Sequence, residues 1–157
     1  MWQRLRRFRN LEPPARGLFL RATALLPVIS LSLRIRGFRA TQLRLEKYLS
    51  NARLGSSSSS PSGLDGRATM TARMVKSAAY WSIGTPTCLE QSLALWWLLG
   101  RQGIASSVRI GTRKAGQKFE AHAWVECDGL ALNEPDQPHL HYAVFDEGFP
   151  ILNRAKK

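Results

Sequence analysis

The sequence predicts an α+β fold, with helices in the first two thirds of the chain and an antiparallel sheet in the last third. Three stretches carry this prediction. Residues 67–81 place apolar side chains on one helical face, and residues 88–99 are apolar nearly all round, which is typical of a buried helix. Residues 119–127 alternate between apolar and polar, as a half-buried strand does. We expect the buried helix to pack on a small antiparallel sheet.

The N-terminal third of the chain is strongly basic. Residues 1–50 hold eleven of the 23 Lys and Arg residues but only two of the 11 Asp and Glu residues, so +9 of the net charge of +12 lies there. This charge suggests an acidic protein or an anionic membrane surface as a partner. Nucleic acid is not expected as a partner, because no base-reading motif accompanies the charge. The two cysteines exclude a disulfide-dense secreted scaffold.

The apolar part of this basic segment is short. The run at 22–33 has twelve residues, whereas a membrane-spanning helix needs roughly 20, and no signal-peptide cleavage site follows it. Membrane contact is therefore expected to be peripheral at most. We expect two amphipathic helices that begin after Pro14 and break near Pro27. The second helix would turn four apolar side chains inward, those of Leu31, Ile35, Phe38 and Leu43.

A low-complexity Ser/Gly stretch divides the chain. We predict a basic N-terminal helical annex at 1–54, a linker or surface loop at 55–66, and a catalytic core at 67–157. Within the core, Thr87 and Glu90 have the spacing of a capping box, which predicts that the buried helix begins directly after Thr87.

Cys88 and His122 are the candidate catalytic pair. Cys88 would occupy the first turn of the buried helix, where the helix dipole and unpaired backbone amides favour a thiolate and can donate to an oxyanion. His122 lies on the polar face of the strand at 119–127 and is the natural base. Either residue alone is more simply a packed core residue, but together they match the nucleophile and base of a cysteine hydrolase.

The third member of a triad depends on the turn at Asp128-Gly129. A two-residue turn would set Asn133 diagonally from His122, whereas a three-residue loop would set Glu134 directly opposite it. Either side chain can accept a hydrogen bond from the imidazole. Both registers stay open at this point.

Three segments resemble the transglutaminase-like peptidases of lasso peptide biosynthesis. They are Thr-Cys-Leu-Glu-Gln-Ser-Leu-Ala-Leu-Trp-Trp-Leu-Leu-Gly-Arg-Gln-Gly-Ile at 87–104, Arg-Ile-Gly at 109–111 and Ala-His-Ala-Trp-Val-Glu-Cys-Asp-Gly at 121–129. The arginine-rich N-terminal third is also similar to that family. The resemblance implies a transglutaminase-like or papain-like cysteine peptidase core, with Cys88 as nucleophile and His122 as base. It implies Glu134 as the third member, where an aspartate is more usual, with Asn133 as the alternate.

The resemblance also implies a function and partners. The protein would be the leader peptidase half of a split lasso B protein, which cleaves the leader from a ribosomally made precursor peptide in the cytoplasm. A small leader-binding protein would present the precursor, and an ATP-dependent macrolactam synthetase would then use the freed core peptide. These hydrolytic steps need no cofactor. The alternatives are another transglutaminase-like amide hydrolase or acyl transferase, and a non-catalytic basic adaptor.

Four further residues could take part in chemistry. Trp124 shares a strand face with His122, so it would either line a substrate cleft or pack beside it. Cys127 lies on the opposite face and is most simply a packed apolar residue. His139 and His141 could suggest a metal site, but no carboxylate or cysteine framework accompanies them, so no metal is expected.

Overall fold

The structure, a computed structural model, describes residues 12–53, 66–82, 84–115, 118–134, 141–144 and 149–150. Their elements are α2 (Pro13–Arg53), α3 (Gly66–Trp81), α4 (Cys88–Arg101), β1 (Ser107–Ala115), β2 (Lys118–Cys127), β3 (Leu130–Ala131), β4 (Ala143–Val144) and β5 (Phe149–Pro150). The helices precede the strands in the chain, and the predicted α+β class is confirmed.

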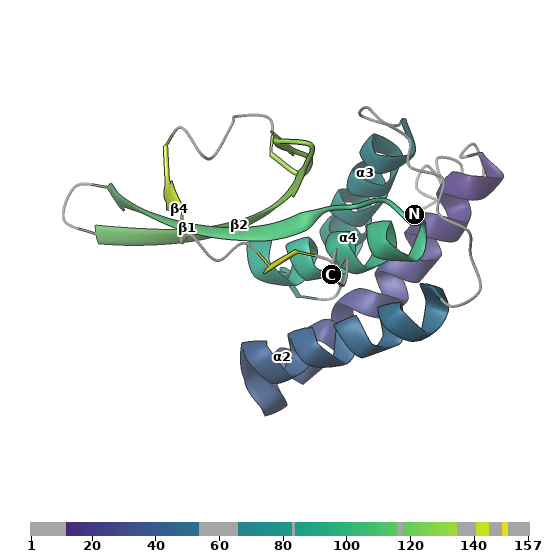
Figure 1. The fold of residues 1–157 in the computed structure, drawn as a ribbon, viewed down its shortest axis with the longest axis horizontal. Coiled ribbons are helices and arrows are strands. Elements are labelled where there is room, and N and C mark those ends of the chain that lie inside the picture. The colour runs from purple at the N-terminus through teal and green to yellow at the C-terminus, as the bar shows by residue number, and fades with distance from the viewer. Residues whose placement is uncertain are drawn as a thin grey trace, which may run out of the picture.

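The sheet is built around the β1–β2 hairpin. β1 pairs with β2 along its whole length, and β3 continues the sheet beyond β2. β4 and β5 pair with different parts of β1 on its other edge, and all these pairings are antiparallel. Figure 1 shows the hairpin extending past the helices, which gather at its other end. The sheet is therefore covered by helices over only part of its length.

The alternation predicted for β2 holds only where helices cover the strand. Ala123, Val125 and Cys127 are buried as expected, but Phe119 is 79% exposed because it lies on the protruding half of the hairpin. Trp124, predicted on the polar face, is also fully buried. β2 is thus buried on both faces at its C-terminal half, beside α4.

α4 is the buried helix that the sequence predicts. Nine of its 14 residues are buried, and it contacts α2, α3, β1 and β2. α3 packs on α2 and α4 and buries small side chains, including Ala72 and Ala78, which lets helices approach closely. The buried side chains of α2, α3, α4, β1 and β2 form one hydrophobic core. Cys88, the first residue of α4, is thereby held half-buried at the end of a largely buried helix.

The break in α2 lies at Gly37 and not at Pro27. Gly37 has φ 77° and ψ 178°, a conformation that only glycine adopts readily, and Figure 1 shows α2 as two segments that meet at an angle. Thr41 fastens the junction, since its hydroxyl donates to the Gly37 carbonyl at 2.8 Å and lies 2.9 Å from the Ser32 hydroxyl. The prediction of a break at Pro27 was wrong because Pro27 lies inside the first segment, on its exposed side.

The apolar side chains of α2 do not all face the core. Ala22, Leu26 and Ile29 are buried against the other helices, whereas Leu31 and Ile35 are 59% and 69% exposed. Of the four residues predicted to face inward, Leu31, Ile35 and Leu43 face outward and only Phe38 packs on the core. For Leu31 and Ile35 the reason is that the first segment is apolar on two opposite sides, and the core can cover only one of them.

By length and composition, Pro13–Leu49 is the one helix in the described part of the chain that is long and apolar enough to cross a membrane. The same test is passed by core helices of soluble proteins, and α2 lays its inner side on α3 and α4. The division into annex, linker and core stays a prediction. Residues 1–11 of the annex and 54–65, which hold most of the linker, lie outside the described residues.

Candidate active site

The N-terminus of α4 is closed by the predicted capping box, which is confirmed. The Thr87 hydroxyl accepts from the Glu90 backbone N–H at 3.3 Å, and the Glu90 carboxylate accepts from the Thr87 backbone N–H at 2.6 Å. Cys88 follows as the first helical residue and is half-buried. The cap leaves the backbone N–H groups of the first two helical residues directed to the helix end beside this thiol.

His122 is held in the middle of β2 by aromatic neighbours. Its ring stacks on Trp124, with 6.3 Å between ring centroids, and lies 5.5 Å from the ring of Tyr142. Gly111 of β1 is directly opposite His122, and a Cβ there would come within 2.9 Å of Tyr142 and 3.0 Å of Trp124. The two aromatic rings can therefore pack around the imidazole only because position 111 has no side chain.

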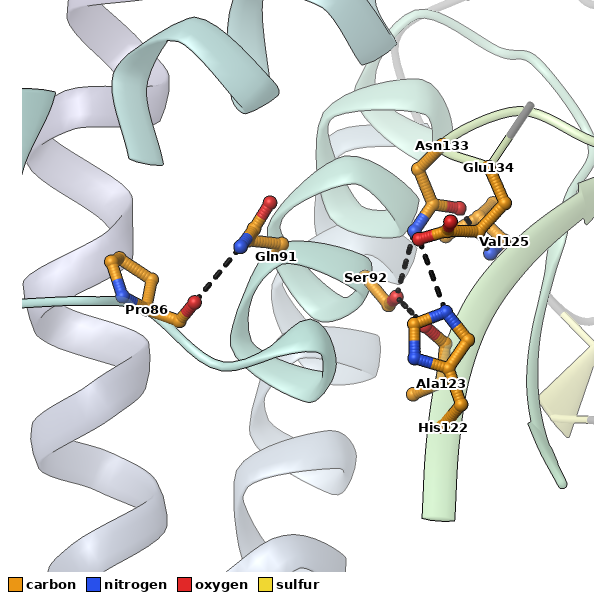
Figure 2. A network of polar contacts seen from close by, with 8 residues as sticks. All are labelled: Pro86, Gln91, Ser92, His122, Ala123, Val125, Asn133 and Glu134. Carbon is orange, nitrogen blue, oxygen red and sulfur yellow. Dashed lines mark hydrogen bonds and ion pairs between the residues drawn. The ribbon is translucent and has the colours of Figure 1, made fainter. Parts of the chain in front are cut away.

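The imidazole is oriented by Glu134. The His122 Nε2 lies 3.0 Å from the Glu134 Oε1, and the two side chains are 22% and 32% exposed. Figure 2 shows Glu134 reaching the ring from the segment after β3. With Nε2–H donating to the carboxylate, the neutral tautomer leaves Nδ1 as an acceptor. Nδ1 has no hydrogen-bond partner among the described residues, so it is free to take a proton.

Asn133 has a different task. Its Oδ1 accepts from the Val125 backbone N–H at 2.8 Å, and its Nδ2 donates to the Ser92 hydroxyl at 3.3 Å. Ser92 in turn donates to the Ala123 carbonyl at 3.0 Å. Figure 2 shows this chain of contacts joining α4 to β2 at Ala123 and Val125, just after His122. Asn133 thus fixes the strand that carries the imidazole and does not contact the ring.

The turn at Asp128-Gly129 is not the three-residue loop that was expected to set Glu134 opposite His122. β2 and β3 pair Cys127 with Leu130, so Asp128-Gly129 is a two-residue turn, and both its residues have positive φ. In that register Glu134 would not face His122 if the ladder continued. The ladder instead ends early, because the Asn133 side chain takes the Val125 N–H that the strand's backbone would have taken. Glu134 then turns back to the ring.

Cys88 and His122 line the same pocket, which has a volume of about 290 Å³. Its lining comes from α3, α4, β2 and the segment after β3, and comprises Ala72, Val75, Lys76, Cys88, Gln91, His122, Asn133 and Glu134. The fold therefore brings three sequence-predicted residues and the predicted alternate together. The pocket holds a thiol, an oriented imidazole and an unpaired ring nitrogen, which are the groups that nucleophilic catalysis by cysteine requires.

Two polar lining residues were missed by the sequence analysis. Gln91 lies one turn after Cys88, and its Nε2 donates to the Pro86 carbonyl at 2.8 Å, with a second N–H left over. The i, i+3 spacing from Cys88 could have revealed it. Lys76 places a positive charge at the pocket from α3, and no sequence signal links it to Cys88.

The remaining candidates lie outside the pocket. Trp124 is fully buried and packs beside His122. Of the two alternatives for this residue, packing is therefore observed, and Trp124 does not line the pocket. Cys127 is buried on the other face of β2, its thiol donates to the Ala105 carbonyl, and burial raises its pKa. His141 is exposed in the turn before β4, and His139 lies outside the described residues. Within the described ranges no three His, Cys, Asp or Glu residues cluster as metal ligands would.

Comparison with protein families gives one match. The family model of the transglutaminase-like superfamily aligns with residues 26–146, which is more than half of the chain. The chain belongs to the transglutaminase-like superfamily. None of the curated proteins and none of the solved structures matches it. The matched range includes α3, α4, strands β1 to β4 and most of α2, so α2 lies largely within the family domain.

The transglutaminase-like fold commonly serves hydrolases and transferases, and membership is compatible with a cysteine peptidase or an acyltransferase. Both activities begin with attack of a thiolate on an amide carbonyl, and they differ in whether water or an amine accepts the acyl group. The pocket around Cys88 and His122 has the groups for that shared first step.

Proposed function

We propose that this superfamily member is a cysteine peptidase that removes the leader from a ribosomally made lasso precursor peptide before macrolactam formation. The observation that carries the peptidase part is the shared pocket of Cys88 and His122, in which the Nε2 of His122 is held by Glu134. The substrate class is supported by the resemblance of the segments at 87–104, 109–111 and 121–129 to leader peptidases of that pathway.

The proposed chemistry uses groups of this chain alone. The Cys88 Sγ, having given its proton to the Nδ1 of His122, attacks the scissile carbonyl carbon. As the C–N bond breaks, the imidazolium returns the proton to the leaving amine, and the leader stays attached as a thioester. His122 then takes a proton from water, which attacks the thioester and releases the leader carboxylate and the Cys88 thiol.

The oxyanion formed in each attack needs hydrogen-bond donors. The backbone N–H of Cys88 is directed to the helix end, and Gln91 has one side-chain N–H in addition to the one bound to Pro86. We assign these two donors to the oxyanion.

The direct test uses the purified protein, its genomically adjacent precursor peptide and the small leader-binding partner. We expect one cleavage, read by mass, that produces free leader and free core peptide. A Cys88→Ala variant with unchanged circular dichroism should leave the precursor intact. Transfer of the leader to an added amine in place of water would show an acyl transferase, and an intact precursor with folded wild-type protein and partner present would contradict the proposal.

The outer side of α2 is proposed to dock the leader-binding partner. This side exposes Leu20, Val28 and Ile35, and α2 has no Asp or Glu between residues 13 and 45. An acidic partner with an apolar patch would complement this surface. Reversing Arg36 and Arg39 to Glu should weaken the association most at low salt. Unchanged partner binding, or binding only to phosphatidylglycerol vesicles, would contradict this assignment and favour a solvated or membrane-facing surface.

The same proposal places the protein in the cytoplasm, together with an ATP-dependent macrolactam synthetase that takes the freed core peptide. The chemistry links these steps, because macrolactam formation needs the amine that hydrolysis exposes.

A further inference from the structure

A second hollow lies on the other side of the first turn of α4. It is a groove of about 740 Å³ between the first segment of α2 and the connection from α3 to α4. Its lining is mainly apolar and includes Leu26, Pro27, Leu31, Trp81 and Pro86. Leu31 is 59% exposed, so the apolar outer side of α2 runs directly into the groove. A hollow of this size accommodates a peptide segment of a few residues.

The groove and the catalytic pocket share one helical turn. Thr87 and Glu90 line the groove, whereas Cys88 and Gln91 line the catalytic pocket. Pro86 lies in the groove wall, and its carbonyl accepts the hydrogen bond from Gln91. An extended peptide spans about 3.3 Å per residue. A chain whose scissile carbonyl lies at Cys88 therefore needs only a few residues to enter the groove.

The groove is lined by two charged residues of opposite sign, Glu90 and Arg34. Glu90 is buried, and its carboxylate is used by the capping box. Arg34 is the other charged lining residue, and it has no hydrogen-bond or ion-pair partner in the described part of the chain. An unpaired guanidinium at the rim of an apolar groove selects a carboxylate, which it can bind with two parallel hydrogen bonds.

Pro27 adds a backbone acceptor to the same wall. Proline has no backbone N–H, so the carbonyl of Thr23, four residues earlier, lacks its usual helical donor. Thr23 and Pro27 both line the groove. A peptide N–H lying in the groove can supply the missing donor, as an extended substrate would.

We propose that this groove binds a segment of the peptide substrate that carries an apolar side chain next to an Asp or Glu, with Arg34 reading the carboxylate and Leu31 and Trp81 contacting the apolar group. The inference rests on the proposed peptidase function, because it assigns the groove to that enzyme's substrate. It makes Arg34 a specificity-determining residue 54 positions before the nucleophile.

The test measures binding without cleavage. A phage library of random dodecapeptides is selected on the Cys88→Ala protein, and enriched peptides are synthesised with a fluorescein label. We expect them to share an acidic residue beside an apolar one. Adding Arg34→Glu should raise the Kd at least tenfold, measured by fluorescence anisotropy at 150 mM salt. Adding Arg21→Glu, the same charge change on an exposed position of the same segment outside the groove, should change the Kd less than twofold.

Two further arms make the result specific. A peptide with its acidic residue changed to Lys should bind the Arg34→Glu variant better than it binds the parent. Leu31→Ser, at an exposed position that cannot unfold the core, should also weaken binding several-fold. Equal effects of Arg34→Glu and Arg21→Glu, enriched peptides without an acidic residue, or no enriched peptide at all would overturn the proposal.

Failure of the proposed function gives a different pattern. If the wild-type protein leaves the precursor intact while the Arg34-dependent peptide binding persists, the peptidase proposal fails and the groove remains a peptide site. If the precursor is cleaved and Arg34→Glu leaves KM unchanged, the groove assignment fails and the peptidase stands. Support for both requires a raised KM with kcat unchanged, because the groove contributes binding and not chemistry.

Discussion

The catalytic pocket and the α2 groove flank the same turn of α4, yet they are built differently. In the pocket, Glu134 holds His122, and Asn133 and Ser92 tie its strand to α4. In the groove, the walls are mainly apolar and Arg34 is unpaired among the described residues. Groups that make and break bonds must be fixed by their neighbours, whereas a surface that recognises a peptide keeps its charge free for the ligand. On our proposals this difference separates chemistry from recognition, so each side can be changed alone.

Removal of the imidazole should have the largest effect on the chemical side. His122→Ala is expected to lower kcat for precursor cleavage by about 10²–10⁴-fold, because general acid and base catalysis are both lost. His141→Ala is the matched control, since His141 is exposed in a turn outside the pocket. Rates are measured by mass spectrometry of the released leader. A wild-type rate for His122→Ala would remove His122 from the mechanism.

Loss of the orienting carboxylate should have a smaller effect. Glu134→Gln keeps the shape but not the charge, and misorientation of the imidazole is expected to lower kcat by about 10²-fold. Glu134→Asp should recover part of this loss, because a carboxylate can still reach the ring. The midpoint of thermal unfolding should change little in either variant, because Glu134 is partly exposed. Equal rates for the Gln and Asp variants would show that the charge has no role.

Substitution of Asn133 should affect stability more than substitution of Glu134 does. Asn133→Ala leaves the Val125 N–H without its acceptor, which is expected to lower the free energy of unfolding by about 1–3 kcal/mol. Urea unfolding followed by circular dichroism measures this loss, with Glu134→Gln as the comparison. If Glu134→Gln lowers stability as much as Asn133→Ala does, then Glu134 also has a structural role and the distinction between the two residues fails.

Gly111→Ala tests the packing behind His122. The added Cβ would meet Tyr142 and Trp124 at about 3 Å, so overpacking should cost about 1–3 kcal/mol of stability and displace the imidazole, which lowers kcat. Gly17→Ala is the control, because nothing lies within 4 Å of its new Cβ and its φ is not in the positive range. Unchanged stability and kcat in Gly111→Ala would contradict the tight packing.

The two cysteines should differ in reactivity. Burial raises the pKa of Cys127, so its thiol stays protonated to higher pH than in the unfolded chain. Iodoacetamide at pH 8 is therefore expected to modify Cys88 before Cys127, as read by peptide mapping. For Cys127 the folded state retains a proton that the unfolded state loses, so stability should fall as pH rises through the alkaline range. Cys127→Val should reduce that fall slightly, and faster modification of Cys127 would contradict its burial.

Local patterns predicted much of the fold. The capping box predicted the exact residue at which α4 begins, and the apolar pattern around the helix predicted its burial. Patterns could not distinguish the two apolar sides of α2, because nothing in the sequence says which side the core covers. Gly37 broke the helix through a positive φ, whereas Pro27 was accommodated on an exposed side.

The site shows the same limit of local patterns. Cys88 and His122 lie on elements whose ends are visible in the sequence, so their proximity could be expected. The contact of Glu134 with His122 depends on Asn133 ending the β2–β3 ladder by a side-chain hydrogen bond. Lys76 reaches the pocket from another helix, and Gly111 matters through two aromatic rings distant in sequence. Such contacts are set by tertiary packing and leave no periodic signal.

The most direct measurement is the mass of the protein trapped during turnover. Wild-type enzyme mixed with precursor and partner is quenched in acid within milliseconds to seconds, and the intact protein is weighed. We predict an adduct with the mass of the leader acyl group, mapped to Cys88 and absent from Cys88→Ala. Cleavage without any adduct on Cys88, or cleavage by Cys88→Ala at the wild-type rate, would contradict the thioester mechanism.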